Sequence, residues 1–234
     1  RGLVMAYRRI LAVGDIHGHF SKLLSVYRKV RFDASKDLLI FLGDYIDRGP
    51  QVRECLAFLM ELAEKKNVVL LRGNHEQMML DHFRKGEGGG IWMPNGGKQT
   101  EAALRAWDKE EPGASARVLR FAEELPLFYS IEQDGARYVF AHAGIRPGVP
   151  PEEQEPCDLL WIREEFYREY EGEAVVVAGH TPTCYIVPRA KKPLFLNRSM
   201  ILVDTGSYLP DGRISIVDVL HRRFWQSDDG GRER

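Results

Sequence analysis

Leu38-Leu39-Ile40-Phe41-Leu42-Gly43-Asp44 is the stretch that indicates the fold, because five apolar residues stop abruptly at a glycine and an acid. The same pattern occurs in Ile10–Val13 before Gly14-Asp15, and in Val68–Leu71 before Arg72-Gly73-Asn74. Short, continuous apolar runs are typical of strands buried on both faces. These three runs therefore predict central strands of a sheet that is covered on both sides.

The segments between the three runs have the spacing of amphipathic helices. Apolar residues recur every three or four positions, at Phe20, Leu23, Leu24 and Tyr27 in the first segment and at Leu56, Leu59, Met60 and Ala63 in the second. The alternation predicts a β-α-β-α-β half and places the chain in the α/β class.

Residues 85–125 have a different character. The glycine-rich stretch Gly86–Gly90 is followed by two helical patterns, Glu101–Trp107 and Ala114–Glu124. We interpret this segment as an inserted helical cap.

The second half of the chain returns to strand patterns joined by two predicted turns. Asp-Gly pairs tolerate positive φ and favour hairpins. The two predicted hairpins are Phe128–Gln133 with Arg137–Ala141 around Asp134-Gly135, and Met200–Val203 with Arg213–Val219 around Asp211-Gly212. We expect a single domain over residues 1–234, with a disordered tail at 227–234.

Composition excludes several classes of protein. The 234 residues are 44% hydrophobic and 29% charged, with a net charge of −1, so one globular domain without a diffuse cationic surface is expected. Without a cationic surface, we predict no nucleic-acid partner. We also predict no membrane partner, since the apolar runs are far shorter than the roughly 20 residues of a membrane span. The unpaired spacing of Cys55, Cys157 and Cys184 and the absence of a secretory signal pattern favour a reducing, cytoplasmic location.

Polar residues follow the predicted strands at the edge where open α/β sheets bind ligands. They are Asp15 and His17 after the first strand, Asp44 after the second, Asn74 and His75 after the third, and His142 and His180 after two later strands. Oxygen and imidazole donors without thiolates suit Mn²⁺, Fe or Zn²⁺. A bridging carboxylate suits a pair of ions about 3.5–4 Å apart.

Three blocks give the chain a specific resemblance. Gly14-Asp15-Ile16-His17-Gly18, Gly43–Gly49 and Arg72–Glu76 resemble the signature blocks of the phosphoprotein phosphatase family, in the family's order. The later blocks also resemble bacterial and phage members; they are His142-Ala143-Gly144, Leu160–Glu164, Gly179–Pro182 and Val203–Gly206. The resemblance implies the calcineurin-like metallophosphoesterase fold, a central two-sheet β-sandwich flanked by helices with a small helical cap.

The resemblance also implies a role for each site residue. One divalent metal would be held by Asp15, His17 and Asp44, and the other by Asp44, Asn74, His142 and His180, with Mn²⁺ as the expected ion. Arg48, Arg72 and Arg163 would bind the phosphate, since guanidinium groups match its oxygens. His75, oriented by Asp47, would protonate the leaving oxygen as a metal-bridging hydroxide attacks in line.

Each residue also has a structural alternative. Asp15, Asp44 and Asn74 could cap helices, and His142 and His180 could be core histidines. Arg163 could pair with acids in a helix. So many blocks in the family's order are difficult to obtain by chance, so we favour the metal site.

The resemblance is less specific about the substrate. His142-Ala143-Gly144 stands where eukaryotic members usually have His-Gly-Gly, and this form also occurs in bacterial diadenosine tetraphosphate hydrolases. We predict an enzyme that hydrolyses phosphoserine and phosphothreonine in proteins, or small phosphoesters. Symmetrical bis(5'-nucleosyl)-tetraphosphate hydrolysis is the alternative activity, and a metal-bound scaffold without catalysis is disfavoured by His75, Arg48 and Arg72. The oligomeric state is left open.

Overall fold

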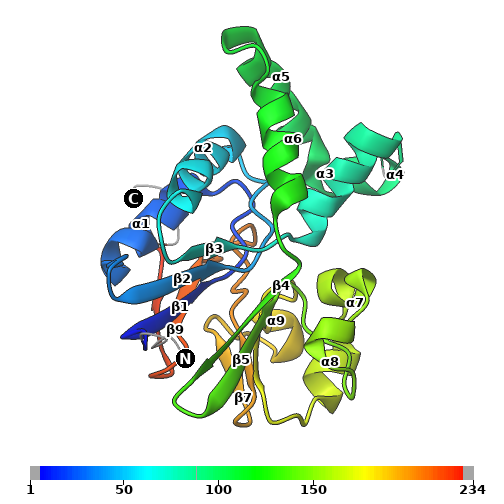
Figure 1. Cartoon of the computed structure of the whole chain (residues 1–234). Helices are drawn as coiled ribbons and strands as arrows, with labels where there is room; N and C mark the ends of the chain where they lie inside the picture. Colours follow the sequence, from blue (N-terminus) through cyan, green and yellow to red (C-terminus); the bar gives the residue numbers. More distant parts are fainter. Residues whose placement is uncertain (1–5, 88, 229–234) are drawn as a thin grey trace.

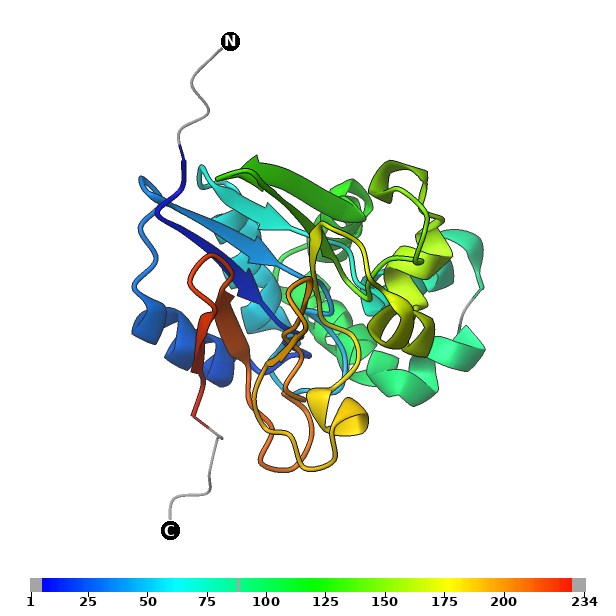
Figure 2. The ribbon, with the colours of Figure 1, turned by 90° about the horizontal axis from the view of Figure 1, so that it is seen from below.

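Two five-stranded sheets lie face to face between layers of helices in the computed structural model, which describes residues 6–87 and 89–228 (Figure 1). Seen from below, α7 and α8 (yellow-green) lie on the opposite side of the molecule from α1 (blue) (Figure 2). This four-layer arrangement confirms the predicted α/β sandwich flanked by helices.

The strands of the first sheet, in spatial order, are β10 (Arg223–Gln226), β9 (Ser215–Asp218), β1 (Arg9–Val13), β2 (Asp37–Phe41) and β3 (Val68–Leu70). Those of the second are β4 (Phe128–Gln133), β5 (Ala136–Ala141), β6 (Val175–Ala178), β8 (Met200–Leu202) and β7 (Leu194–Leu196). The helices are α1 (Phe20–Val30), α2 (Val52–Ala63), α3 (Asn74–Lys85), α4 (Gly89–Trp92), α5 (Lys98–Glu110), α6 (Ala114–Glu124), α7 (Pro156–Trp161), α8 (Glu164–Glu169) and α9 (Thr183–Ile186), with short helical turns η1 (Met93–Gly97) and η2 (Pro151–Glu153).

The parallel strands β1, β2 and β3 end at the same edge of the first sheet. Val13 pairs with Phe41, and Phe41 pairs with Leu70, so the loops that follow these residues start side by side. The predicted β-α-β-α-β half is therefore present, and it gathers three polar loops at one edge.

Alternation along the strands explains why the apolar runs are continuous. Leu39 and Phe41 of β2 belong to the core between the first sheet and the helices, whereas Leu38 and Ile40 belong to the core between the two sheets. Successive side chains of a strand point to opposite faces. A strand with a core on each face needs an apolar residue at every position, as the run in β2 has.

The two predicted hairpins have different outcomes. β4 and β5 pair antiparallel around Asp134-Gly135, as predicted, and both turn residues have positive φ, 54° and 77°. The prediction around Asp211-Gly212 is wrong, because β8 pairs with β6 and β7 in the second sheet while β9 pairs with β1 and β10 in the first. The segment is a crossing between sheets, and pairing partners distant in sequence outweigh the local turn preference.

The helices α4, α5 and α6 with η1 occupy the stretch that we interpreted as a cap (Figure 1, green). They contact α2 and α3, and Trp92, Leu104 and Val118 join the core that also holds the first sheet. Of the predicted tail, residues 229–234 lie outside the described residues, whereas Ser227 is buried and its N–H donates to Ile214 O at 2.9 Å. No helix in the described part of the chain has the length and apolarity needed to cross a membrane.

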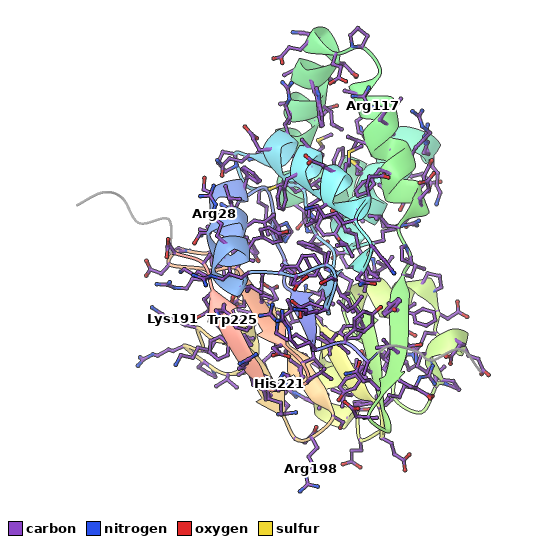
Figure 3. All side chains as sticks on the ribbon, turned by 60° about the vertical axis from the view of Figure 1, so that its left-hand side comes forward. Arg28, Arg117, Lys191, Arg198, His221 and Trp225 are labelled. Atoms are coloured by element: carbon purple, nitrogen blue, oxygen red, sulfur yellow. The ribbon has the colours of Figure 1, made fainter. Side chains whose placement is uncertain are left out.

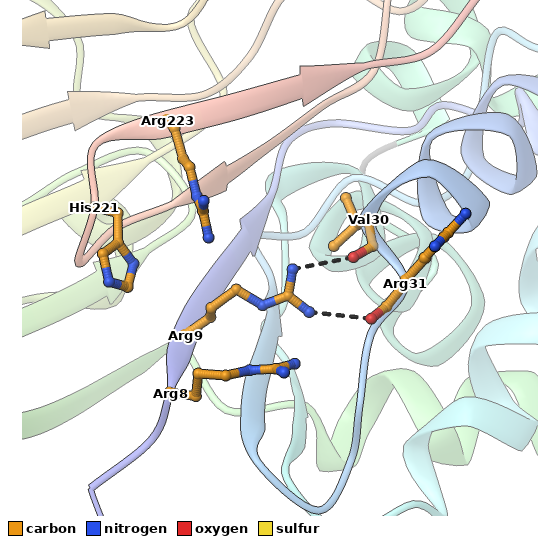
Figure 4. A pocket seen from close by; sticks show the side chains of 6 residues that line it. All are labelled: Arg8, Arg9, Val30, Arg31, His221 and Arg223. Atoms are coloured by element: carbon orange, nitrogen blue, oxygen red, sulfur yellow. Dashed lines mark hydrogen bonds between the residues drawn. The ribbon is translucent and has the colours of Figure 1, made fainter.

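The amino end of β1 carries an ion-pair network beside a cavity of about 380 Å³ (Figure 4). Arg9 donates to Val30 O and Arg31 O at 3.0 Å, and both Arg8 and Arg9 bind the carboxylate of Asp37. These contacts tie β1 and β2 to the end of α1. Because Arg8 and Arg9 both form ion pairs with Asp37, we assign the two arginines a structural role.

Asp37 should make stability depend on pH. Burial alone would raise the pKa of Asp37, but hydrogen bonds from Arg9 and Arg8 lower it to about 2. A depressed folded-state pKa adds stability above the ordinary value of 3.8, and that stability is lost as the pH falls towards 2. We expect Asp37→Asn to lower the free energy of unfolding by about 3–5 kcal/mol at pH 7, since Arg9 is left buried beside a neutral amide.

Urea unfolding of chelator-treated protein at pH 7 and pH 2.5 measures this effect. The difference between wild type and Asp37→Asn should narrow at the lower pH. Glu110→Gln is the control, because it breaks an exposed pair with Arg53 that is worth only about 0–1 kcal/mol. A difference that is the same at both pH values would contradict the role assigned to Asp37.

Candidate active site

The predicted site residues lie in loops with an unusual backbone. His17, Asp44, Asp47, Arg48 and His180 all have positive φ, between 46° and 71°. Non-glycine residues rarely adopt this region, and such strain concentrates where the surrounding structure fixes a functional geometry. The loops are therefore held in place by contacts and not by local preference.

These loops surround a cleft of about 70 Å³. Its lining residues come from both sheets, the cap and the segments around α7 and α9; they are His17, Asp44, Arg48, Asn74, His75, Asn95, Trp161, Arg163, His180, Pro182, Tyr185 and Tyr208. The structure thus brings together residues more than 190 positions apart in the sequence.

One group of possible metal ligands lies around His17. Its Nδ1 is 2.9 Å from Ile46 O and is thereby assigned as the donor, which leaves Nε2 with a lone pair. This Nε2 lies 3.5 Å from Asp44 Oδ2 and 3.9 Å from Asp15 Oδ2. Burial lowers the pKa of His17 well below its ordinary value, so the ring is neutral and able to bind a cation.

A second group lies on the other side of Asp44. His142 Nε2 is 3.4 Å from Asp44 Oδ2 and 2.8 Å from Asn74 Oδ1, and His180 Nδ1 is 3.0 Å from the same amide oxygen. His142 Nδ1 is fixed by Leu42 O at 2.9 Å. The metal-binding atoms of Asp44, His142 and His180 all lie within 4.8 Å of one another.

The charges of the site fit bound cations. Burial, and next the neighbouring Asp204, raise the pKa of Asp15 well above its ordinary value. Burial also raises the pKa of Asp204 to about 6. Burial alone would lower the pKa of His142, but the negative charge of Asp44 outweighs this effect and the pKa of His142 is raised to about 10. Buried carboxylates that repel one another, beside an imidazole that takes up a proton, form a donor set that divalent ions would neutralise. His180 Nε2 is also buried without a hydrogen-bond partner.

Two of the three predicted phosphate-binding arginines line the cleft. Arg48 Nη1 lies 3.1 Å from His17 Nε2, and the guanidinium carbon of Arg48 lies 4.0 Å from the centre of the Tyr208 ring. Arg163 donates to Thr181 Oγ1 at 2.9 Å from the break between α7 and α8. The alternative that Arg163 only pairs with acids in a helix does not describe this position, because the guanidinium also donates to His180 O at 3.4 Å.

The guanidinium of Arg72 is held by residues of α3 and α6. It donates to Gln77 Oε1 at 2.9 Å and to Glu123 O at 2.6 Å, and Arg72 is not among the residues that line the cleft. These contacts join the end of β3 to the cap. Its predicted role in phosphate binding has no geometric support among these contacts.

His75 and Asp47 form a buried pair, with His75 Nδ1 2.6 Å from Asp47 Oδ2. The other ring nitrogen of His75 faces the cleft, 3.9 Å from Asp44 Oδ2. This arrangement fixes the orientation of the ring and leaves one nitrogen available for proton transfer.

Sequence reasoning missed residues that support the site. Glu76 accepts hydrogen bonds from the backbone N–H groups of Asp44, Tyr45 and Gly73 at 2.8–2.9 Å. A glutamate in the first turn of a helix, three residues after the N-cap Gly73, was an available signal for the last of these bonds. Tyr208 had no local signal, because only the fold places it over Arg48.

Comparison with known proteins is consistent with this geometry. Residues 8–208 match the family model described as calcineurin-like phosphoesterase. The chain is 35% identical over 182 residues to serine/threonine-protein phosphatase 1 of Salmonella typhimurium, a match that covers 75% of this chain and 80% of the relative. It is 28% identical to an asymmetrical bis(5'-nucleosyl)-tetraphosphatase of Anoxybacillus flavithermus, over 83% and 84% of the two chains. The fold resembles a solved structure of a candidate diadenosine tetraphosphatase with a TM-score of 0.70, 20% identity and coverage of 97% and 95%.

We expect the protein to bind two divalent ions, and Asp44→Asn to lose both, because Asp44 lies between the two ligand groups. Elemental analysis after loading with Mn²⁺ measures the stoichiometry. His221, labelled in Figure 3, pairs with Asp218 and belongs to neither ligand group, so His221→Asn is a matched control that should keep both ions. Full metal content in Asp44→Asn would contradict the bridging role.

Proposed function

The chain belongs to the calcineurin-like phosphoesterase family and is a metal-dependent phosphoesterase, and we propose that it hydrolyses phosphoserine and phosphothreonine monoesters of proteins. One observation carries the proposal: the buried pair of His75 and Asp47 lies beside the ligand groups, in a small cleft that Arg48 and Arg163 also line. Phosphomonoester hydrolysis uses a proton donor, positive charges that bind the phosphate oxygens, and metal ions. His75, the guanidinium groups of Arg48 and Arg163, and the ligand groups could supply these three parts.

The family is dinuclear-metal dependent, and we propose Mn²⁺ as the ion. Asp15, His17 and Asp44 would hold one ion, and Asp44, Asn74, His142 and His180 the other. When bound, the ions would supply charge neutralisation and an acidified water.

The protein's own residues would bind the substrate and move the proton. A phosphomonoester dianion has three free oxygens, and the planar donors of Arg48 and Arg163 can bind them from two sides of the cleft. His75 would give a proton to the leaving oxygen, while Asp47 accepts the hydrogen bond from Nδ1 and stabilises the charged ring. An intact acid also argues against a scaffold without catalysis.

The cap favours monoesters over dinucleotides. Trp92 and Trp107, the two tryptophans of the cap, are only 0% and 7% exposed and so offer no free face to a base. Two basic residues of the cap form ion pairs with acids of the cap, Arg105 with Glu101 and Arg117 with Glu111. Arg117 lies near the outer end of the cap (Figure 3). These pairs do not form a track for an extended polyphosphate.

Dinucleoside tetraphosphate hydrolysis is the second candidate. It is favoured by the relative from Anoxybacillus flavithermus, whose name specifies the asymmetrical reaction, and by the exposed aromatic rings at the mouth of the cleft. Trp161 is 39% exposed and Tyr185 is 61% exposed, and both line the cleft. Aromatic faces beside phosphate-binding arginines could stack on a base.

His75→Asn should lower kcat for a phosphoserine peptide by roughly 10²–10⁴ while metal content stays unchanged, because a general acid contributes about this much. The loss should be smaller for p-nitrophenyl phosphate, whose leaving oxygen needs no proton. Steady-state kinetics with both substrates tests this, and equal losses would show that His75 does not protonate the leaving group.

The ratio of kcat/KM for a phosphothreonine peptide and for diadenosine tetraphosphate separates the two candidates. We expect the peptide to be preferred with the same Mn²⁺-loaded protein, since the cleft is small and Arg105 and Arg117 of the cap are paired with acids. A tenfold preference for the dinucleotide, about 1.4 kcal/mol of transition-state binding, would reverse the assignment.

A further inference from the structure

The carboxylate of Asp47 is held by two residues of the cap as well as by His75. Trp92 Nε1 donates to Oδ2 at 2.8 Å, the same oxygen that His75 Nδ1 approaches at 2.6 Å. Thr100 Oγ1 donates to Oδ1 at 2.5 Å and accepts from the N–H of Asp47 at 2.9 Å. Both oxygens of Asp47 and its backbone N–H are therefore fixed in a fully buried position.

These contacts matter because the local backbone preference of Asp47 does not hold it in place. Its φ is 71°, in the left-handed region that non-glycine residues seldom adopt. A carboxylate group can rotate about its own bonds, and a rotated Asp47 would leave the ring of His75 without its orienting partner. Trp92 and Thr100 block that rotation from two directions.

The segment between Trp92 and Thr100 packs closely on the same turn. Gly96 has a φ of 103°, and a Cβ atom there would lie 2.6 Å from the backbone N of Arg48. A Cβ atom on Gly97 would lie 2.6 Å from the ring of Trp92. Only glycine allows this approach, so the cap loop and the turn that carries Asp47 and Arg48 are fitted together.

We propose that Trp92 and Thr100 are positioning residues, through which the cap holds Asp47 and thereby aims His75 at the leaving oxygen. The proposal rests on the proposed function, in which His75 is the general acid. It assigns the cap a part in the chemical step in addition to its packing against α2 and α3. The two hydrogen bonds of the Thr100 hydroxyl are both to Asp47, and Thr100 is not among the residues that line the cleft, so its effect on the reaction would pass through Asp47.

Thr100→Val tests the proposal, because it keeps the shape of the side chain and removes both hydrogen bonds to Asp47. We expect kcat for a phosphoserine peptide to fall roughly 10-fold, the size of effect that a misplaced catalytic group produces. The rate with p-nitrophenyl phosphate should change less than about 2-fold, since this substrate does not need the acid. Thr100→Ser, which restores the hydroxyl, should recover the wild-type rate.

Thr183→Val is the matched control. Thr183 is also a fully buried threonine near the cleft, but its hydroxyl has no hydrogen-bond partner, so the same change should leave both rates unaltered. Trp92→Phe is an independent arm that removes the indole N–H, and it should show the same bias against the phosphoserine peptide. Elemental analysis of each variant must still find two ions per chain; a loss of metal together with activity would indicate a purely structural role and overturn the proposal.

A double-mutant cycle shows whether Thr100 acts through Asp47. In an Asp47→Asn background, Thr100→Val should cost almost nothing further, whereas independent effects would multiply and contradict the proposal. The reference variant His75→Asn separates the two levels of inference. If His75→Asn shows no leaving-group bias, the proposed function fails; if it shows the bias and Thr100→Val does not, only the role of Thr100 and Trp92 fails.

Discussion

The carboxylate of Glu76 is the interaction on which the candidate site most depends. It accepts three backbone N–H groups, from Asp44, Tyr45 and Gly73, and so joins the loop after β2 to the loop after β3. Burial and, next, the nearby charge of Asp44 raise the pKa of Glu76 to about 7, which shows that the charge is costly to keep there. The three donors offset that cost, because buried N–H groups also require acceptors. This contact fixes the loop that carries Asp44 relative to the loop that carries Asn74.

Parallel pairing sets the distances that Glu76 completes. The in-register ends of β1, β2 and β3 start three loops side by side, and the second sheet brings His142 and His180 to the same edge from the ends of β5 and β6. The two sheets share a core that contains Ile40, Phe140 and Val177. The relative position of the two ligand groups is thus set by packing deep in the molecule, in a core that a small change in volume would disturb.

The β-α-β-α-β half was predictable from the sequence because its signals are local, whereas the two-sheet sandwich was expected from the family resemblance. Continuous apolar runs predict strands with a core on each face, and the polar residues after them mark the ligand edge. Non-local features could not be predicted in the same way. β9 pairs with β1 across some 200 residues, and this pairing outweighed the turn preference of Asp211-Gly212. The direction of Arg72 depends on Glu123 in α6, which no spacing rule connects to the end of β3.

The contacts of the cap also restrict how this enzyme could diversify. Trp92 and Thr100 both donate hydrogen bonds to Asp47, so an insertion between them would displace one of the two donors. The turn between α5 and α6 is different, because Gly113 faces open space and its neighbours lie at the outer end of the cap. Descendants of this chain could lengthen or replace that turn at little cost to the reaction. Changes at the tip of the cap would leave the contacts that hold Asp47 unaltered.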